Sequence, residues 1–273
     1  MSSRIRVMSY NVRYDNPSDD TYVWRKRRDE VAGVVRFHDP ALVGLQEALH
    51  NQLRDLRDRL SDDYDWLRAG RRDTPQDIVG EYAAIGYDAT RFDLEDQWTL
   101  WLSESGEPGA IGWDAMLPRL VRIAKLREND TGVVFYFCNT HFDHAGERAR
   151  IESAELLRSR IDELPTDAPV VVTGDFNARA VDPAYERLVG DDGRRRLFDA
   201  HFADNVDHHG PETSVTDFTS LVPDRKIDHV FVTGDVEVLL HGTCSDTYDD
   251  GLYPSDHLPV IADVSLPHQR SVD

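Results

Sequence analysis

The sequence predicts an α/β fold in which two packed β-sheets are flanked by helices. Short apolar runs such as residues 170–173 are typical of strands buried on both faces. Longer segments with apolar residues at helical spacing, such as 147–164, alternate with such runs. Other predicted strands, from 82 to 126, follow one another without a helix between them. A mixture of hairpins and strand–helix units is typical of a layered sandwich.

Each element has a local signal in the sequence. Residues 5–13 alternate apolar and polar positions, which predicts a first strand that ends at Asn11. The first helix, residues 25–37, places Val31, Val34 and Val35 on one face and stops before Pro40. A buried strand follows at 41–47, and leucines at 53, 56 and 60 mark a second helix. The remaining strands are predicted at 82–87, 92–102, 120–126, 133–140, 170–173, 227–233, 236–240 and 258–264, with helices at 147–164 and 185–188.

Length and hydropathy predict one domain over residues 1–273, because no linker rich in proline, glycine or serine divides the chain. No apolar run approaches the length of a membrane span, and Met1 to Arg4 lack the apolar stretch of a signal peptide. We therefore expect a cytoplasmic protein that does not associate with membranes.

The charge balance limits the kind of partner. The chain has 51 acidic and 31 basic residues, a net charge of −20. Such a surface repels a polyanion, so an extended basic face for nucleic acid is not expected and recognition of phosphate should be local. The arginine runs at 25–28 and 194–196 are therefore predicted to be solvent-exposed, with Arg25 as the one candidate to line a crevice.

The same charge balance supports a hypothesis about salt. Only three residues are lysines, and a strongly acidic, lysine-poor surface suits a salt-rich cytoplasm, where screening reduces repulsion between like charges. We expect the midpoint of thermal unfolding to rise between low and molar salt. Equal midpoints in the two conditions would contradict a halophilic origin.

Polar side chains recur where predicted strands end. Asp228 starts a further strand, and the others are Asn11, Glu47, His141 with Asp143, Asp175 with Asn177, and Asp256 with His257. Each could be an ordinary turn or cap residue. Strand ends on one side of a layered fold converge on one crevice, however, so a shared site is the more economical interpretation.

The segment from Gly174 to Asn177 shows how such a site would form. Gly174 allows close approach to the neighbouring strand, and an extended backbone would point Asp175 and Asn177 in the same direction.

Six motifs resemble, in order and spacing, those of the endonuclease/exonuclease/phosphatase superfamily. They are Tyr10-Asn11, Leu45-Gln46-Glu47, Asn139-Thr140-His141, Gly174-Asp175-Phe176-Asn177, Ile227-Asp228-His229 and Ser255-Asp256-His257. Residues 12–17, 24–28, 113–115 with Arg119, and 141–146 are similar to a prokaryotic branch related to nocturnin-type deadenylases. The resemblance implies the DNase I-like fold, a four-layer α/β sandwich with two mixed sheets. One departure is His229, where an aromatic residue such as tyrosine is common in relatives; it concerns local packing and not Asp228.

The resemblance implies a metal site. Glu47, with Asn11 and Asp256, would hold Mg²⁺ or Mn²⁺, because oxygen ligands select a hard cation. Asp143 and His144 would shape the loop after His141, and a second metal there is the alternative. The cluster Asp207-His208-His209 is expected to be an exposed loop and not a metal site.

The resemblance also implies catalytic roles. Asp175 and His257 would jointly activate water, with Asp228 fixing the His257 tautomer. Asn177 and His141 would bind phosphoryl oxygens, and a protonated His141 could assist the leaving group. Arg119 would bind the substrate phosphate or, alternatively, be an exposed arginine at a strand end.

The sequence is compatible with three functions. The first is a metal-dependent phosphodiesterase or nuclease that acts, exonuclease-like, on single-stranded nucleic acid. The second is a phosphatase or phosphodiesterase of a small soluble phosphate ester, which the missing basic surface favours. The third is a phosphate-binding module without catalytic activity, against which the intact set of acidic and histidine residues argues.

Overall fold

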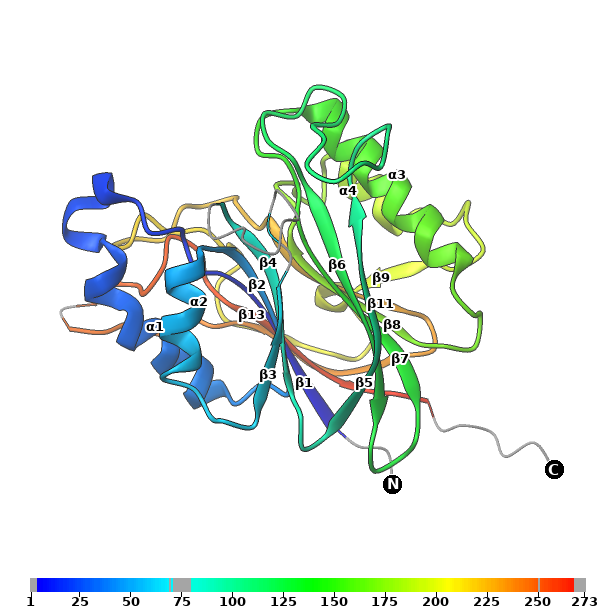
Figure 1. Ribbon diagram of the computed structural model, residues 1–273, viewed down its shortest axis with the longest axis horizontal. Helices are drawn as coiled ribbons and strands as arrows, with labels where there is room; N and C mark the ends of the chain where they lie inside the picture. The colour runs from blue at the N-terminus through cyan, green and yellow to red at the C-terminus, as the bar shows by residue number, and fades with distance from the viewer. Residues whose placement is uncertain (1–3, 69, 71–79, 250, 268–273) are drawn as a thin grey trace.

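The computed structural model describes residues 4–68, 70, 80–249 and 251–267. In these residues two β-sheets pack face to face and helices cover both outer faces (Figure 1), which confirms the predicted fold class. Residues 1–3, which belong to the segment expected to lack a signal peptide, lie outside the described residues. Among the described helices, none has the length and apolar character needed to cross a membrane.

Both sheets are mixed. In the described part of the chain the first has seven strands, in the order β10 (His208–His209), β12 (Glu237–Thr243), β13 (Val260–Ser265), β1 (Arg4–Asn11), β2 (Leu42–Ala48), β4 (Tyr82–Asp88) and β3 (Tyr64–Leu67). The second has six, in the order β5 (Phe92–Trp101), β6 (Leu120–Glu128), β7 (Val134–His141), β8 (Val170–Asp175), β11 (Asp228–Thr233) and β9 (Leu197–Asp199).

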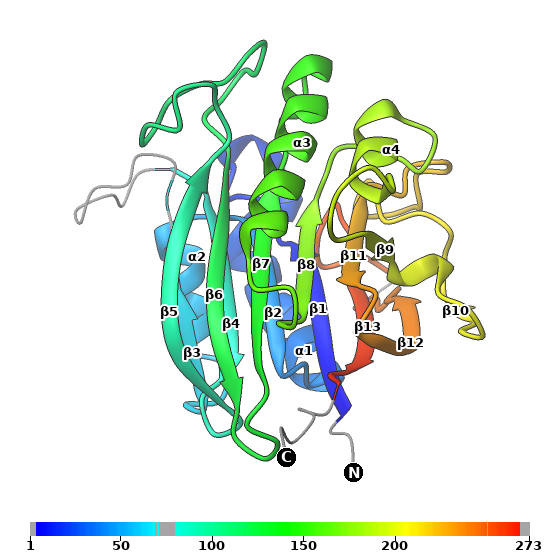
Figure 2. The ribbon, with the colours of Figure 1, turned by 90° about the vertical axis from the view of Figure 1, so that its right-hand side faces the viewer.

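Three apolar layers hold the sandwich together. The first sheet is covered outside by α1 (Trp24–His38) and α2 (His50–Arg57), and the second by α3 (Glu147–Glu163) and α4 (Pro183–Val189), as Figures 1 and 2 show. Val171 faces the opposite sheet, whereas Val170 and Val172 pack under α3 and α4. This alternation explains why the run at 170–173 is apolar throughout.

Strand direction brings the polar strand ends together. β11 runs antiparallel to β8, and its first residue, Asp228, pairs in register with Asp175, the last residue of β8. β13 likewise runs antiparallel to β1, so Asp256 and His257, which precede β13, lie at the edge where β1 ends at Asn11. Residues before a strand and residues after its antiparallel neighbour therefore share one edge.

A polar bridge joins the sheets beneath this edge. The Asn139 amide on β7 donates hydrogen bonds of 2.8 Å to the backbone oxygens of Leu45 and Ala84 in the other sheet. Gln46 donates to the Asn139 side-chain oxygen at 2.7 Å. All these groups are buried, and a buried polar group without a partner is costly, so the bridge fixes how the sheets meet.

Gly44 allows the close approach that this bridge needs. A Cβ atom at this position would lie 2.1 Å from Thr173 Oγ1 and 2.5 Å from Asn139 Oδ1, both in the opposite sheet. We expect Gly44→Ala to lower the free energy of unfolding by about 2 kcal/mol, because overpacking forces the sheets apart.

The matched control is Gly33→Ala in α1, where the nearest atom to an added Cβ is the flexible tip of Arg36 at 3.8 Å. This variant should gain about 0.5 kcal/mol from the better helix propensity of alanine. Chemical denaturation measures both changes, and a Gly44→Ala protein as stable as Gly33→Ala would contradict the tight contact.

The sequence-based prediction missed three edge strands, β3, β9 and β10. They are short and only partly buried, so they lack a clear apolar pattern. The expected exposed loop at Asp207-His208-His209 was therefore partly wrong: His209 is exposed, but His208 is half-buried in β10 and contacts His241 through their Nδ1 atoms, 2.9 Å apart.

The expectation that both arginine runs face solvent was also partly wrong. Arg25 is exposed, but Arg27 is fully buried and bonds four backbone carbonyls. Arg195 is buried as well and donates to the oxygens of Pro165 and Ala168. The aliphatic part of an arginine side chain can be buried while its guanidinium donates hydrogen bonds to backbone carbonyls. A run of charged residues in the sequence does not show which arginine does so.

Candidate active site

Asp175 lies at the centre of the polar strand ends. Its Oδ2 atom accepts a hydrogen bond of 3.0 Å from the Asn11 amide and lies 3.4 Å from His141 Nε2 and 3.8 Å from His257 Nε2. Its Oδ1 atom accepts from the backbone N–H of Asn177 at 3.0 Å. These contacts join residues from both sheets in one cluster, as the convergence of strand ends predicted.

The loop after Asp175 differs from the predicted extended backbone. Asn177 has a φ of 48°, in the left-handed region, so its backbone turns back to bond Asp175. Its amide nitrogen still reaches the cluster, at 3.2 Å from His141 Nε2. The role of Gly174 is confirmed, because a Cβ there would lie 2.8 Å from Thr140 on the neighbouring strand.

Asp228 orients His257. Its Oδ2 atom lies 2.8 Å from His257 Nδ1 and also accepts a 2.6 Å hydrogen bond from the Ser214 hydroxyl. Because a carboxylate only accepts, His257 carries a proton on Nδ1 and turns Nε2 toward Asp175. Ser214 was not predicted, since it lies in an irregular stretch with no strand pattern.

Burial and neighbouring charges shift the pKa values of this pair. Burial, together with the Asp228 carboxylate, raises the pKa of Asp175 to about 7. Burial lowers the pKa of His257, but the carboxylates of Asp228 and Asp175 outweigh it and hold this pKa well above its usual range. Near neutral pH, Asp175 can therefore take up a proton while His257 stays charged.

Two of the three predicted metal ligands, Glu47 and Asn11, lie beside Asp175. Glu47 Oε1 accepts from the Asn11 amide at 3.0 Å and Oε2 from the Tyr14 backbone N–H at 3.1 Å. Asn11 turns its amide nitrogen toward both carboxylates, and its oxygen accepts from the Arg13 backbone. In this arrangement Asn11 orients the Glu47 and Asp175 carboxylates, and its own oxygen is not turned toward a cation between them.

The donor set fits a hard divalent cation. Glu47 is the carboxylate of this set that would hold the cation, and one ligand atom of it lies within 4.8 Å of one each from His141 and Asp175. Burial and the Glu47 carboxylate also raise the pKa of Asp256, against the opposing effect of His257. Carboxylates held this close repel one another, and a dication would offset that repulsion.

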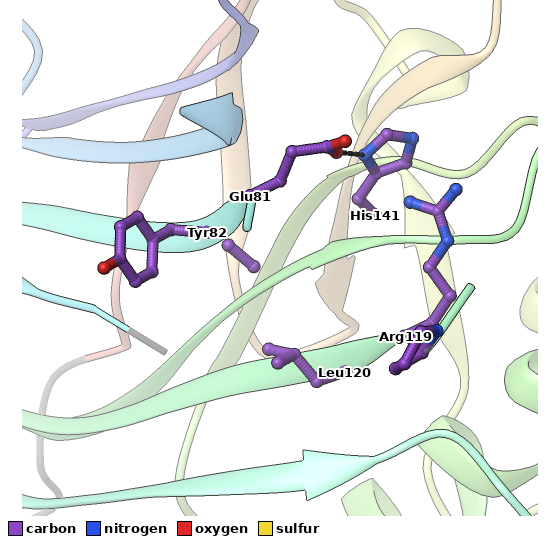
Figure 3. Close-up of a pocket in the computed structure, with 7 residues that line it drawn as sticks. Glu81, Tyr82, Arg119, Leu120 and His141 are labelled. Atoms are coloured by element: carbon purple, nitrogen blue, oxygen red, sulfur yellow. Dashed lines mark ion pairs between the residues drawn. The ribbon is translucent and has the colours of Figure 1, made fainter. Parts of the chain in front are cut away.

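A small pocket of about 20 Å³ opens beside His141. Figure 3 shows the Glu81 carboxylate facing His141, with the Arg119 side chain extending toward the same place. Glu81 precedes β4, which is antiparallel to β2, so it lies at the edge that carries Glu47. The sequence-based prediction did not include Glu81, although the rule of antiparallel neighbours would have found it.

Arg119 is not the exposed strand-end arginine that was the alternative. It is only 4% exposed, its Nε atom donates to Asp143 at 3.3 Å and its Nη2 atom lies 3.1 Å from His144 Nδ1. Among the described residues, its Nη1 atom has no hydrogen-bond partner. Asp143 also accepts from the backbone N–H groups of Ala145 and Gly146, which supports its predicted role in the loop.

His229, the departure from the common aromatic residue, is buried and makes specific contacts on both sides of its ring. Its Nδ1 atom lies 2.8 Å from Asp199 and its Nε2 atom 3.0 Å from the Ala178 oxygen. The ring also stacks on Phe231, with centroids 5.4 Å apart. Both nitrogens of this buried histidine are therefore hydrogen-bonded, and its ring packs on a neighbouring aromatic side chain.

Comparison with known proteins places these features in a family. Residues 8–257 match the model of the "Endonuclease/Exonuclease/phosphatase family". An endonuclease/exonuclease/phosphatase from Bacteroides vulgatus is 37% identical, with a TM-score of 0.89 over 97% of this chain and 99% of that one. A mannosyl-6-phosphatase from Bacteroides thetaiotaomicron is 33% identical, with a TM-score of 0.85 over 95% and 99%.

A more distant structure shares the fold. The human nocturnin catalytic domain is 19% identical, with a TM-score of 0.74 over 96% of this chain and 93% of that one. The family match covers most of the chain and includes every residue of the cluster around Asp175. The chain therefore belongs to the endonuclease/exonuclease/phosphatase family, whose members are metal-dependent phosphoesterases.

Proposed function

We propose that this protein is a divalent-metal-dependent phosphatase of a small soluble phosphate ester. The observation that carries the substrate class is the 33% identity, over 95% of the chain, to a mannosyl-6-phosphatase. The net charge of −20 supports it, because an acidic surface disfavours a long polyanion and tolerates a small ester. Action on single-stranded nucleic acid, the first hypothesis from the sequence, has no comparable support.

The cluster supplies the groups that phosphate ester hydrolysis needs. Asp175, with a pKa raised to about 7, would accept a proton from the attacking water. His257, kept charged by Asp228, would donate a hydrogen bond to a phosphoryl oxygen rather than act as the base. The pKa directions support this division of the roles that the sequence left joint.

The remaining groups would bind the phosphate. Asn177 and His141 would donate to the phosphoryl oxygens, and Arg119, which lines the small pocket, would add its Nη1. Glu47 and Asp256 would hold the cation, with Asn11 orienting Glu47. When bound, a divalent cation offsets negative charge on the phosphoryl oxygens.

A hydrolysis panel tests the proposal. Phosphate release would be measured with sugar phosphates, nucleotides and p-nitrophenyl phosphate, and chain shortening with single-stranded RNA and DNA, each with Mg²⁺, with Mn²⁺ and with chelator. We expect cation-dependent release from small monoesters, abolished in Glu47→Gln. Shortening of polynucleotides with no activity on monoesters would instead establish a nuclease. Silence on all substrates would support the binding module.

A further inference from the structure

Three histidines from separate elements meet outside the cluster around Asp175. His201 lies in the short 3₁₀ helix η2 (Ala200–Phe202), His208 in β10 and His241 in β12. His208 and His241 are direct neighbours across the β10–β12 pair, and Figure 2 shows these strands at one edge of the sandwich, near β9. The three ring centroids lie 4.5 to 5.2 Å apart.

The hydrogen bonds of these rings leave bare nitrogens that face inward. His208 Nε2 lies 3.0 Å from the Pro211 carbonyl oxygen, which can only accept, so Nε2 carries the proton and Nδ1 is bare. The bare His208 Nδ1 lies 2.9 Å from His241 Nδ1. His201 Nε2 lies 3.5 Å from the exposed Glu212 carboxylate, a contact that favours a proton on Nε2 and a bare Nδ1.

Two ring nitrogens of this cluster have no hydrogen-bond partner among the described residues. If His241 donates from Nδ1 to His208, its buried Nε2 is an acceptor whose lone pair meets no donor. In the described part of the chain, His241 Nε2 and His201 Nδ1 are both buried without a hydrogen-bond partner. Buried polar atoms in that state are uncommon in native structures, and a bound water or ion would satisfy them.

We propose that His201, His208 and His241 bind a divalent transition metal ion of the Zn²⁺ type. One ring nitrogen of each lies within 4.8 Å of the other two, close enough for small ring rotations to complete a shared site. A carboxylate and a carbonyl oxygen hold the opposite nitrogens of His201 and His208, as is usual for metal-binding histidines. Three imidazoles favour Zn²⁺, Ni²⁺ or Cu²⁺, whereas the carboxylates around Asp175 favour Mg²⁺ or Mn²⁺.

A cavity and two residues of opposite charge lie next to the three histidines. A cavity of about 370 Å³ that opens to the surface is lined in part by His201. Lys226 also lines this cavity, and its charge acts on both His201 and His241. Asp199 acts on the same two histidines with the opposite sign. The proposed ion would therefore be repelled by Lys226 and stabilised by Asp199.

A bound ion would connect the two sheets at their edge. His208 and His241 belong to the first sheet, whereas His201 follows β9 of the second. An ion held by all three stabilises the folded state by its binding free energy, because the unfolded chain has no formed site. We expect Zn²⁺ to raise the midpoint of thermal unfolding in a background of Mg²⁺.

The test compares two adjacent histidines. Zn²⁺ binding would be measured by calorimetry in excess Mg²⁺, using the full-length protein with Glu47→Gln to weaken the carboxylate site. We expect one Zn²⁺ per chain. His208→Gln should weaken this binding at least about tenfold and remove the thermal shift. His209→Gln, the control in the same strand with an exposed side chain, should leave both unchanged.

A second variant covers the case in which His208→Gln does not fold. Lys226→Met removes the nearby positive charge and should tighten Zn²⁺ binding severalfold. No Zn²⁺ binding in the Glu47→Gln background would overturn the proposal, as would equal affinity in the His208→Gln and His209→Gln proteins. An unchanged affinity in Lys226→Met would overturn the placement of the ion among these three rings. None of these outcomes depends on the phosphatase activity.

Discussion

Asp175→Asn is expected to lower kcat by about three orders of magnitude without unfolding the protein. The substitution removes the group that would accept the proton of the attacking water and keeps its size, including an oxygen for the Asn177 backbone N–H. The measurement is kcat on the best monoester at saturating Mg²⁺. A loss of less than about tenfold would show that another group activates water.

Although Asp175→Asn should lower kcat, it should raise the stability of the folded protein. Because the folded-state pKa of Asp175 is raised to about 7, its ionisation opposes folding, and stability falls as pH rises from about 4 through 7. Asparagine does not ionise, so with chelator present Asp175→Asn should unfold at a higher temperature than the wild type at pH 8. At pH 4 this difference should shrink.

Asp143→Asn provides the matched control at the neighbouring strand end. Burial raises the pKa of Asp143, but hydrogen bonds from the backbone N–H groups of Gly146 and Ala145, with Arg119 nearby, lower it overall to about 2. A depressed pKa contributes stability above about pH 4 that is lost as pH falls toward 2. Asp143→Asn should therefore unfold at a lower temperature than the wild type at pH 8. Shifts of equal sign in the two variants would contradict this account of the electrostatics.

Site residues that directly follow a recognisable strand could be predicted from the sequence. Asp175, Glu47 and His141 each follow an apolar run, so their position at a sheet edge follows from the strand that precedes them. The two sheets, their mixed character and the helices that cover them also follow from such runs and from the family resemblance. Strand direction then explains why Asp228 meets Asp175.

Residues that depend on distant contacts could not be predicted. Ser214 bonds Asp228 from an irregular stretch, and Arg27 belongs to a charged run that resembles a solvated helix face. His201 and His208 lie in short elements and His241 in the neighbouring strand β12, and only the tertiary fold brings the three together. Periodicity identifies what a strand or helix buries, but not which loop residues meet in space.

Arg27→Lys is expected to lower both stability and activity, although Arg27 lies outside the cluster. The fully buried guanidinium donates to the backbone oxygens of Tyr22, Val12, Arg13 and Pro254. Val12 and Arg13 follow Asn11, and Pro254 lies two residues before Asp256. Arg27 thus connects the two segments that carry Asn11 and Asp256, and we regard it as a positioning residue.

Lysine carries a single nitrogen and cannot span four carbonyls, so some would stay buried without a donor. We expect a loss of about 3 kcal/mol in the free energy of unfolding and a KM for the cation raised more than kcat is lowered. Arg25→Lys is the control, since Arg25 is exposed two residues earlier in the same helix and its replacement should change stability by less than about 0.5 kcal/mol. If the two variants match in unfolding and cation dependence, Arg27 does not position these segments. A loss confined to stability would limit its role to holding the fold.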